Sequence, residues 1–139
     1  MLHGTCAAAL ILTTLLSGCS RQRLLDDEEL KGAATEIISI ASEGELLAAA
    51  AGEKHVGANY AKGHPEYLRK QAEDVTSELS QGRADGHAQH QFERLRQSAT
   101  QLMETLQALP ANVGDPSWHQ SSLQLDSIRR EAEEIRRKL

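Results

Sequence analysis

Apolar residues recur at alternating spacings of three and four along most of the chain. The longest unbroken run consists of Ala88, Phe92, Leu95, Ala99, Leu102, Leu106 and Leu109. This spacing places all the apolar side chains on one face of an α-helix. A strand would need apolar residues at every second position to achieve the same. The pattern therefore predicts amphipathic helices that bury one face against each other.

Three further segments repeat this spacing, so the sequence predicts four helices. Their expected ranges are residues 26–52, 64–81, 85–109 and 117–139. The other three apolar stripes are Leu30, Ala34, Ile37, Ala41, Gly44, Leu47 and Ala51; Leu68, Ala72, Val75 and Leu79; and Trp118, Leu125, Ile128, Ala132, Ile135 and Leu139. Each stripe is narrow enough to be one buried face of a bundle helix.

Residues with known preferences for helix ends set the expected boundaries. Pro65 suits the first turn of the second helix, which leaves residues 52–63 as a glycine-containing connector. Pro110 ends the third helix, and Ser117 is expected to cap the fourth. Gly44 has two interpretations: it allows a neighbouring helix to approach closely, or it marks a kink, because Ser42-Glu43-Gly44-Glu45 resembles a capping box.

Four amphipathic helices with short connections predict an all-α, up-down antiparallel bundle. Aromatic residues make up only 3% of the chain, so its core must come from leucine, isoleucine, valine and alanine. The third and fourth helices have the cleanest stripes and are expected to pair as a hairpin. The alternative architecture is an extended helical hairpin that dimerises.

The N-terminal segment has the features of a targeting signal. Residues 1–18 contain no Lys, Arg, Asp or Glu, and the apolar run at 7–16 is shorter than the ~20 residues that span a bilayer. It is followed by Leu16-Ser17-Gly18-Cys19, which resembles the lipobox of bacterial lipoproteins. The resemblance covers about the first 20 residues. It implies cleavage before Cys19 and acylation of the Cys19 thiol.

This resemblance implies three regions: a signal peptide at 1–18, a lipidated cysteine with its tether at 19–25, and a helical bundle at 26–139. One departure from the lipoprotein pattern is the lack of a basic residue before the apolar run, which points either to an upstream start codon or to a weak signal. Ser20, in place of aspartate, implies the outer membrane facing the periplasm if the cell is Gram-negative. Cys6 would leave with the signal, so the mature chain would hold no disulfide.

Several function classes are disfavoured. The net charge of -5 does not suit a surface that holds nucleic-acid phosphates. No GxSxG elbow, phosphate-binding loop or HExxH motif is present, so no catalytic residue is expected. His87 and His90 have a spacing that can hold a metal on a helix, but neither follows a glutamate as in Glu-x-x-His, and His90 is predicted to face solvent. We therefore expect neither a metal site nor a cofactor.

A candidate contact surface lies around the connector and the start of the second helix. It comprises His55, Tyr60, His64 and Tyr67, and includes both tyrosines of the chain. Tyrosine is enriched at protein interfaces. The alternative is that the two tyrosines simply close the end of the bundle. The expected function is that of a non-catalytic envelope lipoprotein, an adaptor or structural partner of another envelope protein. The alternative is a periplasmic bundle that binds a small ligand or a metal.

Overall fold

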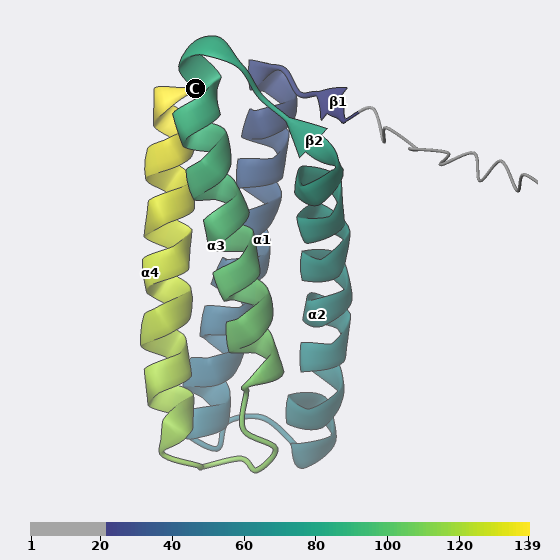
Figure 1. The fold of residues 1–139 in the computed structure, drawn as a ribbon. Coiled ribbons are helices and arrows are strands. Elements are labelled where there is room, and N and C mark those ends of the chain that lie inside the picture. The colour runs from purple at the N-terminus through teal and green to yellow at the C-terminus, as the bar shows by residue number, and fades with distance from the viewer. Residues whose placement is uncertain (1–21) are drawn as a thin grey trace, which may run out of the picture.

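The computed structural model describes residues 22–139, which fold into four long helices. These are α1 (Asp27–Gly52), α2 (Ala58–Gln81), α3 (Gln89–Gln107) and α4 (Ser117–Lys138). They lie side by side and alternate in direction, as Figure 1 shows. The predicted up-down antiparallel bundle is confirmed. α3 packs against α4 as expected, but the most extensive contact is the one between α1 and α4.

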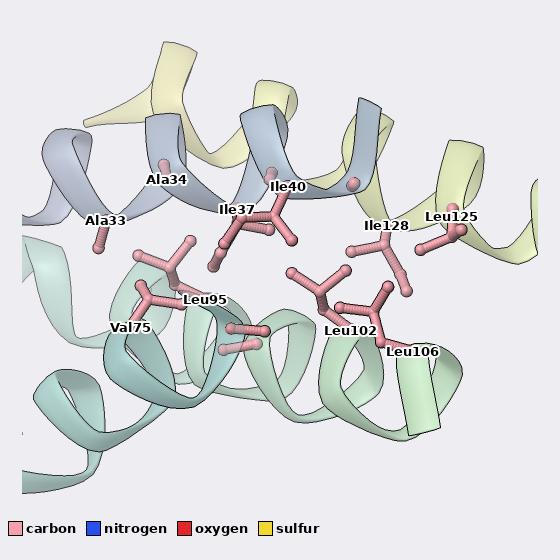
Figure 2. Packing of buried hydrophobic residues seen from close by; sticks show 14 of the residues in the cluster. Ala33, Ala34, Ile37, Ile40, Val75, Leu95, Leu102, Leu106, Leu125 and Ile128 are labelled. Carbon is pink, nitrogen blue, oxygen red and sulfur yellow. The ribbon is translucent and has the colours of Figure 1, made fainter. Parts of the chain in front are cut away.

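The core is formed by the predicted apolar stripes. Figure 2 shows side chains from all four helices meeting between the ribbons, among them Ile37, Val75, Leu102 and Leu125. All residues of these stripes are buried except Leu109 and Leu139, which lie at the ends of their stripes and are partly buried. Trp118 is completely buried, and its indole Nε1 donates a hydrogen bond of 2.8 Å to the carbonyl oxygen of Asn112.

α1 continues through Gly44 without a break, so the interpretation of Gly44 as a kink is wrong. The Ser42 hydroxyl donates to the Ile38 carbonyl within the helix instead of capping a new one. A Cβ atom on Gly44 would lie 3.2 Å from Leu125 Cδ1 and 3.4 Å from Leu106 Cδ2. The close-approach interpretation of Gly44 is therefore confirmed.

At the starts of α1 and α4, backbone N–H groups donate hydrogen bonds to carboxylates. Asp26 and Glu29 form a capping box at the start of α1, with the Glu29 N–H donating to Asp26 Oδ1 at 2.9 Å. Ser117 is the first residue of α4 and not its cap, which corrects the prediction. The Asp115 carboxylate accepts hydrogen bonds from both the backbone N–H and the hydroxyl of Ser117.

The second helix begins earlier than predicted. α2 starts at Ala58, so the connector is only residues 53–57 and Pro65 lies inside the helix. A proline there forfeits one backbone hydrogen bond of the helix. The segment before it is nevertheless helical: the Ala61 N–H donates to the Gly57 carbonyl at 3.0 Å, and Ala61 and Pro65 are both buried. Burial of this face outweighs the lost bond.

The predicted third helix is divided. A short 3₁₀ turn, η1 (Gly86–Ala88), precedes α3, which ends two residues before Leu109. The stripe nevertheless continues through the turn, because Ala88 is buried like Phe92. The three-and-four spacing of apolar residues therefore identified the buried face correctly even where the backbone is not α-helical.

A small parallel ribbon closes the end of the bundle where the described chain begins. β1 (Arg23–Leu24) pairs with β2 (Gly82–Arg83), and the N–H of the next residue, Leu25, donates to the Arg83 carbonyl at 2.8 Å. Leu25 is buried against Gly82, where an added Cβ would overlap the leucine side chain. Residues 23–25, predicted as part of a tether, thus belong to the fold. Cys19 and the predicted signal peptide lie outside the described residues.

The two ends of the bundle differ in what they carry. The ribbon, the α2–α3 connection and the C-terminus of α4 lie at one end, as Figure 1 shows. The connector 53–57 and the α3–α4 loop lie at the other end. Within residues 22–139, none of the helices combines the length and apolar content needed to cross a bilayer.

Candidate functional site

Three of the four predicted contact residues form an aromatic row on α2. Tyr60, His64 and Tyr67 are spaced four and three apart, so they lie on one face of the helix. The Tyr60 and His64 rings are stacked, with centroids 4.7 Å apart and planes inclined by 15°. The His64 and Tyr67 centroids are 5.7 Å apart, with planes inclined by 35°. The row extends over about two helical turns.

His64 attaches this row to α1. Its Nε2 atom lies 2.7 Å from Oε1 of Glu43, a distance at which the imidazole donates a hydrogen bond to the carboxylate. The His64 side chain is only 17% exposed, whereas Tyr60 and Tyr67 are 52% and 53% exposed. The histidine is therefore held between the helices, and the two tyrosines present their rings to solvent on either side of it.

An open hollow of about 370 Å³ lies between α1 and α2 beside Tyr67. It is lined by Glu36, Ser39, Ile40 and Glu43 from α1 and by Tyr67, Gln71 and Asp74 from α2. We call this hollow the α1–α2 groove. Gln71 Nε2 donates to the Tyr67 hydroxyl at 3.0 Å, which fixes the tyrosine at the edge of the groove. The lining includes three carboxylates and no cationic side chain.

His55, the fourth predicted contact residue, is not part of the row. It lies in the connector, with Nδ1 3.1 Å from Oε2 of Glu53, and its side chain is 71% exposed. Glu43 is a member of the site that sequence reasoning missed. It lies one position before the buried Gly44, on the flank of the α1 stripe. That flank position indicated an interhelical contact but not its partner.

The remaining histidines within residues 22–139 do not gather into a site. His90 is exposed, as predicted, and so is His119. His87 is exposed as well, with Nε2 3.2 Å from Oδ2 of Asp27. Across the described part of the chain, no group of three or more His, Cys, Asp or Glu side chains is arranged to hold a metal ion.

The α1–α4 interface differs from the α1–α2 groove in its charge balance. Arg129 of α4 lies between Glu45 of α1, at 3.2 Å, and Glu133 of α4, at 2.9 Å. The hydrogen bonds that Arg129 donates, first to Glu133 and then to Glu45, raise the pKa of Arg129. Hydrogen bonds from Arg130, with a further one from Arg129, lower the pKa of Asp126. Acidic residues along this interface thus have arginine partners within the protein.

The comparisons with known proteins returned no relative. No protein-family model matches the chain, and neither a curated protein nor a solved structure was found to be similar to it.

Proposed function

We propose that this chain is a lipid-anchored envelope protein that acts as a non-catalytic adaptor. In this proposal an acyl-modified Cys19 holds the bundle at a membrane, and the α2 aromatic row contacts another envelope protein. The observation that carries the proposal is the pair of half-exposed tyrosines arranged around His64. The lipobox-like segment Leu16-Ser17-Gly18-Cys19 supports the anchor.

The position of the ribbon determines how such an anchor would orient the bundle. Three residues separate Cys19 from Arg23, the first residue of β1. Fully extended, this stretch reaches roughly 14 Å from Cys19 to Arg23. Anchoring at Cys19 would therefore hold the ribbon end close to the membrane. The start of α2 would then lie farther out by the length of α1, roughly 40 Å for its 26 residues.

The aromatic row suits a protein contact for energetic reasons. Tyrosine provides a large, partly apolar contact area, and only two side-chain torsions must be fixed on binding. Stacking on His64, which itself bonds to Glu43, orders the rings before a partner arrives. Less conformational entropy is then lost on association. Tyr60, nearer the start of α2, would lie farthest from the membrane.

The α1–α2 groove supports the alternative function, binding of a small ligand, less well than it supports the adaptor function. Pockets for small molecules usually enclose most of the ligand surface. The α1–α2 groove is open to solvent, and its exposed lining is more polar than apolar. It therefore suits a side chain presented by a larger partner better than an enclosed small molecule.

Cross-linking in intact cells tests the proposal. A tagged wild-type chain is compared with Cys19→Ala and with Tyr60→Ala/Tyr67→Ala. The matched control is Leu46→Ala/Leu123→Ala, which removes two other exposed large side chains. We expect one dominant envelope partner, lost with the anchor and with the tyrosines but retained in the control. Absence of a specific partner from both the wild type and Cys19→Ala would overturn the adaptor function.

A further inference from the structure

We propose that the α1–α2 groove and the adjoining aromatic row bind a basic peptide segment of the partner protein, with a lysine or arginine side chain in the groove. This inference rests on the proposed adaptor function and specifies the chemistry of the partner. Three features support the inference: the charge of the groove, the aromatic row beside it and the length of that row.

The groove contains negative charge that the described chain does not neutralise. Within residues 22–139, neither Glu36 nor Asp74 forms an ion pair, and Glu43 is bonded only to the His64 imidazole. Lys70 is exposed one turn from Asp74 and forms no ion pair within that range. Several acidic side chains elsewhere in the bundle do have cationic partners, as with Glu45 and Arg129, or Glu131 and Arg94. A cation from another molecule would complement the groove.

Tyr67 supplies a second, independent feature that favours a cation. Its half-exposed ring borders the groove and is held there by the bond from Gln71. Ammonium and guanidinium groups are attracted to the face of an aromatic ring. Guanidinium groups also donate several hydrogen bonds to carboxylates while they stack. One cation could therefore contact Tyr67 and a carboxylate together.

The aromatic row favours a peptide over a free cation. It continues past the groove from Tyr67 to Tyr60, which are seven positions apart on α2. This corresponds to roughly 10 Å along the helix axis. A small polyamine would use the charges but leave the exposed Tyr60 ring without a partner. A segment with a basic residue followed by apolar or aromatic residues would use both.

The test is the binding of a fluorescently labelled Arg-Arg-Leu-Tyr-Leu-Gly peptide to the full chain in zwitterionic detergent, measured by anisotropy at physiological salt. Glu36→Gln/Asp74→Asn neutralises the groove. The matched control, Glu28→Gln/Asp85→Asn, makes the same change of charge in the acidic hollow beside the ribbon, which contains no tyrosine. Tyr67→Phe keeps the aromatic ring, whereas Tyr67→Leu removes it. Circular dichroism melting checks that each variant is folded.

We expect the groove variant to weaken binding about fivefold, because each exposed charge pair contributes a factor of about two to three. The control should change binding by less than about twofold, because salt screens charges beyond about 8 Å. Tyr67→Leu should weaken binding and Tyr67→Phe should not.

Two results would overturn the inference. One is equal weakening by both pairs of substitutions, which would show attraction to the net negative charge alone. The other is spermine binding as tightly as the peptide and insensitive to Tyr67→Leu, which would show a site for free polyamines. If cross-linking still captures an anchor-dependent partner, the adaptor function holds and only the assignment of the groove fails.

Discussion

Gly44 lies where α1 packs against leucines from two neighbouring helices. Leu125 and Leu106 methyl groups occupy the space that a side chain at this position would need. Gly44→Leu should therefore lower the free energy of unfolding by about 1–3 kcal/mol or more, as overpacking of a filled core does. Urea unfolding followed by the fluorescence of Trp118, the single tryptophan, measures this change.

Gly32 provides the control on the same helix. It is exposed, and an added Cβ would meet nothing within 4 Å. Gly32→Ala should raise the free energy of unfolding by about 0.5–1 kcal/mol, because alanine restricts the unfolded chain and favours the helix. Similar effects at the two glycines would contradict the packing assigned to Gly44.

At the scale of residues, the sequence predicted which side chains are buried. It did not predict which side chains of different helices bond to each other. The three-and-four period identifies which side chains of each helix face inward, and residues such as Ile37 and Leu102 are fully buried. The same period, applied to Tyr60, His64 and Tyr67, indicates a shared face. The bond from His64 to Glu43 depends on how α1 and α2 are rotated about their axes. No pattern within a single helix contains that information.

The ribbon ties the start of the described chain to the end of α2. Gly82→Ala should displace Leu25, because the added Cβ would overlap its side chain. Leu25→Ala should cost about 2–5 kcal/mol, as buried leucine truncations do. The double variant should be less destabilised than the sum of the two single variants, because the shortened side chain leaves room for the new Cβ. Additive losses in chemical unfolding would contradict the contact.

On α4, Asp126 links two arginines and should make stability depend on pH. Hydrogen bonds from Arg130 and Arg129 lower its pKa in the folded protein. The ionised carboxylate therefore stabilises the fold above the ordinary aspartate pKa of about 4, and this contribution is lost as the pH falls through the lowered value. Asp126→Asn should be less stable than wild type at pH 7, and the difference should shrink in acid.

Thermal melts of the wild type and Asp126→Asn between neutral and acidic pH check this prediction. A stability difference that stays constant across the range would show that the Asp126 carboxylate does not stabilise the fold through its charge.

At the scale of elements, errors arose where local preferences compete with tertiary contacts. Pro65 favours a helix start, but burial of Ala61 and Pro65 extends α2 by nearly two turns before it. The ribbon could not be foreseen, because strands of two residues have no detectable alternation. Its pairing of Arg23 with Gly82 joins residues far apart in the sequence.

At the scale of the whole bundle formed by residues 22–139, two helix–helix interfaces contain arginines that pair with their carboxylates, whereas the α1–α2 groove contains carboxylates without such a partner. Arg129 bridges α1 and α4, and Arg94 bridges α3 and α4, while the α1–α2 groove has none in its lining. Exposed ion pairs add little to stability, about 0–1 kcal/mol each. The asymmetry therefore bears on recognition more than on folding, and it supports the proposal that this face meets a basic partner.

The proposed anchoring at Cys19 underlies both the orientation of the bundle and the adaptor role. Mass spectrometry of the chain purified from membranes of its own cells tests it most directly. We predict a mature chain that begins at Cys19 and carries the added mass of acyl groups on that residue. A chain that retains residues 1–18, or one that begins elsewhere without lipid, would contradict it.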